Sequence, residues 1–137
     1  MSDIAKRRVI TMTGKDYQPT EEAEQAAFIE CVSLMQSQLP ELALLFHIPN
    51  GGYRPTATAA KLKAQGVKPG VPDLFLQVAR GNYHGLWIEL KRRRSGKLSP
   101  AQQSWLIELN FQNYRAEVAH GSEEACAILY SYLTEVQ

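Results

Sequence analysis

Residues 70–91 read GVPDLFLQVARGNYHGLWIELK and contain two apolar runs of strand length. The runs at 73–78 and 84–91 are rich in Leu, Phe, Val, Ile and Trp, which suit a buried strand. Between them, the Arg-Gly-Asn sequence at 80–82 is typical of a hairpin turn. We therefore expect these two runs to pair as a β-hairpin.

Charged side chains interrupt this apolar hairpin. In the strand 84–91 side chains alternate between faces, so Trp87, Glu89 and Lys91 point away from the apolar Leu and Ile residues. Pairing of the two strands brings Asp73 beside Glu89. Two carboxylates about 4 Å apart repel by about 4 kcal/mol at an effective dielectric of about 20. A proton, Lys91 or a divalent cation must therefore neutralise them.

A divalent cation would give these residues a chemical role. Carboxylates, a backbone carbonyl and water are the oxygen ligands that Mg²⁺ and Mn²⁺ prefer. A bound metal can hold a phosphate oxygen and lower the pKa of a water molecule, and Lys91 can orient that water or stabilise charge on phosphorus. A plain cross-strand ion pair between Glu89 and Lys91 is the structural alternative, which these residues alone leave open.

The rest of the chain predicts helices and strands around the hairpin. A first helix begins after Pro19, with Thr20 as N-cap and acids in its first turn, and ends at Pro40. Further expected elements are a strand at 42–48, a helix at 56–65, a helix opening with a Ser99-Pro100 capping pattern, a strand at 115–120 and a helix at 123–133. Residues 1–18 are expected to form a flexible N-terminal arm. This order predicts a single α/β or α+β domain.

Composition agrees with one globular domain. The chain has 137 residues, of which 45% are hydrophobic and 21% are charged. Cys31 and Cys126 lack any Cys-x-x-Cys spacing, which indicates neither a disulfide framework nor a zinc ribbon. The sequence shows no signal-peptide core and no apolar run of membrane-spanning length. We therefore expect a cytoplasmic protein with no membrane partner.

Positive charge is concentrated in the middle of the chain. The net charge is only +1, but residues 51–97 contain ten Lys or Arg against two acids, a balance of +8 that leaves −7 for the remainder. Such a segment attracts a polyanion such as nucleic acid. A solvated basic face that improves solubility is the alternative explanation of the same charges.

Four motifs resemble one nuclease family in the same order. They are His47–Arg54, Leu62–Leu74, Trp87–Lys91 and Leu98–Gln102. Together they resemble the VRR-NUC family, a branch of the PD-(D/E)XK nuclease superfamily found in phage proteins and repair nucleases. The resemblance covers about residues 20–135. It implies a VRR-NUC-like nuclease domain at 19–137 with a restriction-endonuclease-like core, a mixed central sheet flanked by helices.

The resemblance also implies a metal-dependent phosphodiesterase. Asp73, Glu89 and the backbone carbonyl of Leu90 would bind Mg²⁺ or Mn²⁺, and Lys91 would serve the nucleophile. Gln102 matches the family's glutamine after Ser-Pro and would face the site. The capping pattern of its helix explains Gln102 equally well, and the two roles are compatible.

The family places a glutamate of the first helix near the metal. Glu21, Glu22 and Glu24 all precede Gln25, and Glu21 is our first choice because it lies on the side of the helix that carries Phe28. An acidic first turn that interacts with the helix dipole is the ordinary explanation of all three.

The basic segment supplies candidate contacts to DNA phosphates. These residues are Asn50, Arg54, Lys61, Lys63, Lys68, Arg92 and Arg93. Asn50 also suits a simple turn, because Asn-Gly is a frequent turn dipeptide. His47 is assigned to a hydrogen bond at a strand end and Trp87 to packing.

The basic segment and the resemblance together predict a divalent-metal-dependent DNA endonuclease, and the resemblance implies selectivity for branched, junction or flap DNA. Because a two-stranded cut needs two sites, we expect a homodimer. The alternative is a non-catalytic DNA-binding accessory subunit of a phage or repair complex, which would bind DNA without metal. A third possibility is a small globular scaffold whose acids form a buried ion-pair network with Lys91 and Arg92.

Overall fold

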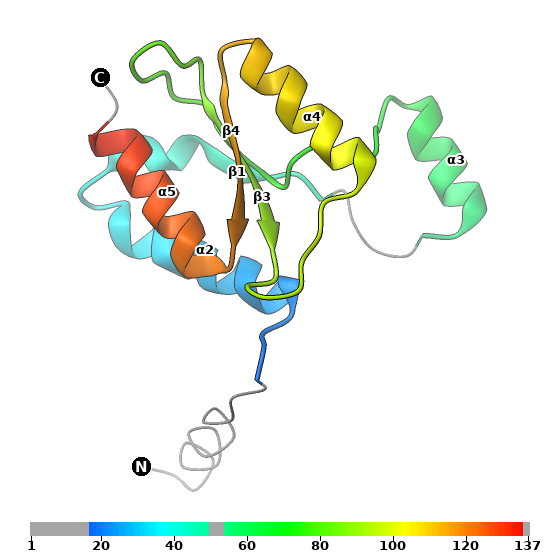
Figure 1. The fold of residues 1–137 in the computed structure, drawn as a ribbon, viewed down its shortest axis with the longest axis horizontal. Coiled ribbons are helices and arrows are strands. Elements are labelled where there is room, and N and C mark those ends of the chain that lie inside the picture. Colours follow the sequence, from blue (N-terminus) through cyan, green and yellow to red (C-terminus); the bar gives the residue numbers. More distant parts are fainter. Residues whose placement is uncertain (1–16, 50–53, 136–137) are drawn as a thin grey trace, which may run out of the picture.

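The computed structural model describes residues 17–49 and 54–135 (Figure 1). Among these residues the elements, in chain order, are α2 (Glu21–Met35), the 3-10 helix η1 (Pro40–Leu44), β1 (Leu45–His47), α3 (Thr56–Ala64), β2 (Leu74–Leu76), β3 (Leu86–Lys91), α4 (Pro100–Phe111), β4 (Arg115–His120) and α5 (Ser122–Thr134). None of the described helices is long and apolar enough to cross a membrane.

The four strands form one mixed sheet in the order β1-β2-β3-β4. β1 pairs with β2 and β2 with β3 in antiparallel fashion, whereas β3 and β4 are parallel. The parallel pair needs a long connection, and α4 provides it. The expected hairpin between β2 and β3 is present, with Arg80 and Tyr83 bridged near its turn. A mixed sheet flanked by helices confirms the predicted fold class.

One face of the sheet packs against α2 and α5. Phe28 of α2 and Leu129 of α5 are fully buried against Ile88 and Leu90 of β3. Strand alternation sends these β3 residues to the apolar face, as the sequence predicts. Each buried Leu, Ile or Phe side chain contributes about 1.5–3 kcal/mol. This apolar contact therefore fixes both helices on the sheet.

The opposite face carries α4 and the polar side chains of β3. Leu106 and Leu109 of α4 pack around Ala116 of β4. Trp87 stacks on Phe75 with ring centroids 4.1 Å apart, which confirms its packing role. α3 stands away from the sheet beyond α4 and has no buried residue (Figure 1).

The segment around Pro40 differs from the prediction. The first helix ends at Met35 instead of Pro40, and the expected strand 42–48 is η1 followed by the short β1. Pro40 starts η1, where its fixed φ fits and its missing N–H removes no hydrogen bond. Leu42 of η1 is only 2% exposed. The apolar run therefore marks a buried turn as well as a strand.

Two strands are shorter than expected. β2 covers Leu74–Leu76 instead of 73–78, and β3 covers Leu86–Lys91 instead of 84–91. β2 pairs with three residues of β1 on one side and with three residues of β3 on the other. The last helix begins at Ser122, one residue before the predicted start.

The start of α2 is held by contacts from distant segments. The Thr20 hydroxyl accepts a hydrogen bond from the Ala23 N–H, which confirms the predicted N-cap. Arg92 donates to the backbone carbonyls of Pro19 and Gln18, and the Gln18 side chain accepts from the N–H groups of Arg94 and Ser95. Of the predicted arm 1–18, residues 1–16 lie outside the described residues, whereas Gln18 belongs to the packed domain.

Glu24 joins α2 to α5 inside the protein. Its side chain is 1% exposed, accepts from the Arg93 guanidinium at 2.7 and 2.9 Å and accepts from the Ser122 N–H. Gly121 precedes α5 and has no side chain to cap it, so Glu24 supplies the missing acceptor. Glu24 is therefore a structural carboxylate.

Candidate active site

Asp73 and Glu89 meet where β2 begins and β3 nears its end. The register pairs Leu74 with Ile88, so Asp73 falls beside Glu89 on the α4 face of the sheet. The Asp73 Oδ2 atom accepts a hydrogen bond from the Leu90 N–H at 2.8 Å. Asp73 thus extends the β2–β3 pairing by one side-chain hydrogen bond.

Glu89 is buried and only partly satisfied. Its Oε1 accepts a hydrogen bond from Gln102 Nε2 at 2.8 Å, and Lys91 Nζ lies 3.5 Å away. Its Oε2 is buried and accepts no hydrogen bond from the other described residues, and the Asp73 carboxyl lies within hydrogen-bonding reach of the Glu89 carboxyl. Burial, and then the charge of Asp73, raise the pKa of Glu89 from 4.5 to about 8. Burial likewise raises the pKa of Asp73.

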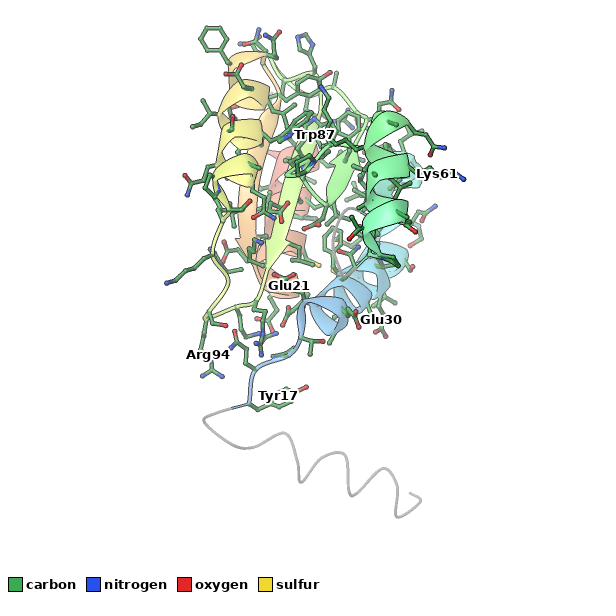
Figure 2. All side chains as sticks on the ribbon, turned by 90° about the vertical axis from the view of Figure 1, so that its right-hand side faces the viewer. Tyr17, Glu21, Glu30, Lys61, Trp87 and Arg94 are labelled. Atoms are coloured by element: carbon green, nitrogen blue, oxygen red, sulfur yellow. The ribbon has the colours of Figure 1, made fainter. Side chains whose placement is uncertain are left out.

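Lys91 lies between two carboxylates. Its Nζ atom is 3.5 Å from Glu89 and 3.8 Å from Oε1 of Glu21, at the start of α2. Figure 2 shows Glu21 beside the end of β3. The Lys91 side chain is only 10% exposed. A Cβ atom at Gly96 would lie 2.6 Å from the Lys91 Cβ, so the loop after β3 can cover Lys91 only with glycine there.

Gln102 performs both of the roles that the sequence left open. Its Oε1 accepts from the Ser99 N–H at 2.9 Å, which completes the capping box of α4. Its Nε2 donates to Glu89 at 2.8 Å. One amide therefore caps a helix with its oxygen and fixes a buried carboxylate with its nitrogen.

The backbone of β3 directs the Leu90 carbonyl toward the Asp73 side of the strand. The Lys91 carbonyl accepts from the Gly121 N–H, on the β4 side of the strand. Successive residues of a strand direct their backbone groups to opposite edges. The Leu90 carbonyl therefore faces the edge where its own N–H meets Asp73.

A cavity of about 950 Å³ opens beside Asp73. α2 contributes Glu21 and Gln25 to its lining, and the sheet contributes His47, Asp73 and Leu90. His47 Nδ1–H donates to the Asp73 carbonyl oxygen at 2.9 Å, which confirms its expected role at a strand end. The cavity is large enough for a substrate group, since ligand pockets typically measure about 300–1,000 Å³.

The donor set fits a hard divalent cation. The carboxyl groups of Asp73 and Glu89 and the Leu90 carbonyl lie at one edge. Within the described part of the chain, no three His, Cys, Asp or Glu side chains form a metal-binding group. A metal here would need backbone and water oxygens as well, which Mg²⁺ accepts and structural zinc does not.

A family model for the VRR-NUC domain matches residues 19–123. The chain belongs to the VRR-NUC family. Membership gives it a nuclease-type, DNA-related function. A solved structure of a VRR_NUC domain protein is 32% identical, with a TM-score of 0.71, and covers 85% of this chain and 89% of that chain. The comparison with curated proteins returns no match.

This relative supports the fold described above. The four-stranded mixed sheet with flanking helices agrees with a restriction-endonuclease-like VRR-NUC core. The candidate site of this VRR-NUC domain is assigned from the positions of its own side chains. Asp73, Glu89, Lys91 and Gln102 converge as the sequence predicts, and Glu21 reaches Lys91.

Four of the basic residues predicted to contact DNA fall into two groups in this VRR-NUC domain. Arg92 and Arg93 have partners inside the protein, Arg92 with backbone carbonyls and Arg93 with Glu24. Lys61 and Lys63 are exposed on α3, and Lys61 points outward from it (Figure 2). The first group has a structural role besides any contact with DNA.

The remaining predicted DNA contacts lie near a second cavity or outside the described residues. Arg54 and Lys68 line this cavity of about 520 Å³. Arg54 also donates to the Pro49 carbonyl at 3.1 Å. Asn50 lies outside the described residues. The DNA-binding role of all these residues stays a prediction.

Sequence reasoning missed the burial of Glu24. A signal was present, because Glu24, Phe28 and Val32 are spaced by four and share one helix face. Helical spacing therefore placed this carboxylate in the core, whereas Glu21 lies at the exposed start of α2. Gln25 was also missed, although it lines the same cavity as Asp73.

Proposed function

We propose that this VRR-NUC domain is a divalent-metal-dependent endonuclease that hydrolyses DNA phosphodiester bonds. One observation carries the proposal. Glu89 is buried beside Asp73, and its Oε2 accepts no hydrogen bond from the described chain. Two adjacent buried carboxyl groups are costly to ionise unless a cation compensates their charge, and the raised pKa of Glu89 reflects that cost. A cation shared by Glu89 and Asp73 would compensate this charge.

Asp73, Glu89 and the Leu90 carbonyl would hold Mg²⁺ or Mn²⁺. The bound metal supplies a Lewis acid for a phosphate oxygen and lowers the pKa of a water molecule. The chain's own groups do the positioning. Gln102 fixes the orientation of Glu89, and the Leu90 N–H fixes Asp73.

Lys91 would serve the attacking water. Its ammonium group is held between Glu89 and Glu21, at 3.5 and 3.8 Å. An ammonium so placed orients a water molecule or stabilises the charge that develops on the phosphoryl oxygens. Hydrolysis forms one P–O bond from water and breaks one ester P–O bond, which leaves a phosphate and a hydroxyl end.

The charge distribution supports DNA as the substrate. It also supports recognition by the structure of the DNA and not by its base sequence. Residues 51–97 carry a balance of +8, and phosphate contacts position a protein on DNA without reading its sequence. Lys61 and Lys63 on the projecting α3 are suited to such contacts. We extend the proposal to a homodimer, since one domain presents one site and a two-stranded cut needs two.

A cleavage assay tests the proposal. Supercoiled, linear, flap and four-way-junction DNA are incubated with the protein in Mg²⁺, Mn²⁺ or EDTA. We expect cleavage with either metal, none in EDTA, and at least a hundredfold loss in Asp73→Ala and Lys91→Ala, as is typical when one group that stabilises the transition state is removed. Glu30→Gln, an exposed change on α2 (Figure 2), is the control and should cut normally.

Two results would contradict the proposal. No nicking of any of these substrates with either metal would refute nuclease activity on them, and DNA binding that is equal in EDTA would then favour the accessory subunit. Cleavage by Lys91→Ala at the wild-type rate would show that Lys91 does not serve the nucleophile.

A further inference from the structure

The second cavity, of about 520 Å³, lies between α3 and α4. α3 contributes Leu62 to its lining, α4 contributes Trp105, and the segment from α3 to β2 contributes Val67 and Lys68. None of the described residues that line the cavity is fully buried, so it opens to solvent. A Cβ atom at Gly66 would meet nothing within 4 Å, which agrees with open space there. A ligand can therefore enter this cavity from outside.

The second cavity adjoins the cavity beside the carboxyl pair. Pro49 lines both of them. Ile48, which lines the second cavity, donates its backbone N–H to the Asp73 carbonyl at 2.7 Å. A DNA strand with one phosphate at Asp73 would thus have a neighbouring nucleotide close to the second cavity.

The two cavities differ in charge. The first is lined by three acids, Glu21, Glu22 and Asp73. The second is lined by Arg54 and Lys68 and has no acid among its described lining residues. Arg54 donates one hydrogen bond to a backbone carbonyl, and its guanidinium has further N–H groups for a phosphate. The first cavity therefore suits a cation, and the second suits an anion.

An aromatic ring and aliphatic side chains form the rest of the second cavity. The aliphatic residues include Ile48, Leu62 and Val71. The Trp105 N–H donates to the Pro69 carbonyl at 3.0 Å, which pairs the one polar atom of the indole and leaves apolar ring surface for a ligand. Aromatic side chains bind nucleobases by stacking, with little dependence on which base it is. A ring, apolar walls and two cations match a base together with its phosphate.

We propose that the second cavity binds one unpaired nucleotide of the DNA, with its base against Trp105 and its phosphate near Arg54 and Lys68. A base inside a duplex has both faces covered by its neighbours, so only an unpaired or extruded base can enter a cavity and stack there. This proposal rests on the proposed nuclease function and deepens it. It names an unpaired nucleotide next to the cleaved bond as the feature that distinguishes flap or branched DNA from plain duplex.

Variants at two positions test the cavity. Val67→Glu places a negative charge in it, at a side chain that is 38% exposed and outside the core. Ile107→Glu, at an exposed position of α4 outside the lining, is the matched control. Trp105→Leu removes the ring and Trp105→Phe keeps one. Because Trp105 also packs against Leu106 and Leu109, Tm is recorded for every variant, and Val67→Glu keeps the test valid if Trp105→Leu is unstable.

The main readout is DNA affinity without cleavage. A fluorescein-labelled duplex, and the same duplex with a single-stranded flap, are titrated in EDTA and in Ca²⁺. We expect the wild type to prefer the flap DNA, and this preference to fall about fivefold or more in Val67→Glu and Trp105→Leu, as for the loss of one stacked base. Ile107→Glu and Trp105→Phe should retain it.

Tryptophan fluorescence gives a second readout. The chain has two tryptophans, so Trp87→Phe leaves Trp105 as the only one. We expect the emission of Trp105 to fall when flap DNA binds and to change little with the duplex.

The outcomes separate this proposal from the nuclease function. Equal wild-type affinity for flap and duplex DNA, wild-type preference in both Val67→Glu and Trp105→Leu, or unchanged Trp105 emission would each overturn the proposal, even if the protein cuts DNA. An equal loss of affinity for both DNAs in Val67→Glu would also overturn it, since the cavity would then contact only the backbone. If the wild type cuts no DNA while its preference for flap DNA depends on Val67 and Trp105, the nuclease function fails and the nucleotide site stands.

Discussion

Glu89 combines two unfavourable surroundings, a buried position and a neighbouring carboxylate. Both raise its pKa, to about 8 in the absence of a metal. Gln102 and Lys91 interact with one of its oxygens, and the neighbouring Asp73 carboxyl lies within hydrogen-bonding reach of the group. A carboxyl group that holds its proton near neutral pH gives it up when a cation arrives, so metal binding at this site should release protons.

The raised pKa of Glu89 predicts how the stability of the metal-free protein depends on pH. In the unfolded chain Glu89 loses its proton near its ordinary pKa of 4.5, but in the folded protein it keeps the proton until about pH 8. Between these values the folded state binds more protons, so stability falls as pH rises. Urea unfolding in EDTA from pH 5 to pH 8 should show this decline.

The decline should be smaller in Glu89→Gln, because its amide does not titrate. Asp73, whose pKa is also raised, leaves part of the slope. Glu30→Gln, at an exposed position on α2, should retain the full slope. An equally steep slope in Glu89→Gln would show that Glu89 is ionised throughout this range.

At the scale of elements, the carboxylate of Glu24 connects two helices and a loop. It pairs with Arg93 in the segment after β3 and caps the first turn of α5. The site depends on the same neighbourhood, because Lys91 precedes Arg93 by two residues and Glu21 begins α2. Glu24 therefore fixes the segment after β3 against the start of α2, where Lys91 contacts Glu21.

Replacing Glu24 should destabilise the whole domain. Glu24→Ala leaves Arg93 without its partner and the start of α5 without its cap, so we expect a loss of about 3 kcal/mol in the free energy of unfolding. Chemical denaturation measures it. Glu22→Ala, two residues away and exposed, should change stability by less than about 0.5 kcal/mol. Equal stability of both variants would contradict the structural role of Glu24.

At the scale of the whole molecule, the mixed sheet places the site. β2 runs antiparallel to β3, so the first residue before β2 meets a residue near the end of β3. α4 then connects β3 to β4. Gln102, in the first turn of α4, donates a hydrogen bond to Glu89. A site built from two strands and two helix ends exists only in the folded chain.

Metal binding should therefore stabilise the fold as a whole. At a free Mg²⁺ or Mn²⁺ concentration a hundredfold above Kd, the gain is about 2.7 kcal/mol, because the unfolded chain has no such site. Thermal unfolding of the wild type should shift upward with metal, most clearly near pH 8. Asp73→Ala should show no shift, and an equal shift in this variant would place the bound metal elsewhere.

Much of the fold was predictable because its signals are local. The Thr20 cap, the Ser99 capping box and the alternation of β3 depend on residues a few positions apart, and the structure confirms each. The convergence of Asp73 with Glu89 follows from one hairpin register. Motif order along the chain was enough to indicate the VRR-NUC family.

Other features depend on segments that are distant in sequence. Arg93 and Glu24 carry charges that local reasoning assigned to DNA binding or to a helix dipole, and each is the other's partner. The apolar run after Pro40 gave no sign that η1 would bury Leu42. In these cases a side chain's role depends on what it meets after folding.

The amino-acid order by itself determined most of the elements, the pairing of β2 with β3 and the set of polar groups at their edge, since each needs only near neighbours. The tertiary structure decided which charges are buried and which arginines hold the backbone. The Glu24–Ser122 hydrogen bond spans 98 residues, and the Gln18–Ser95 hydrogen bond spans 77. Burial and pairing over such separations arise only when the whole chain packs, and they set the electrostatics of the site.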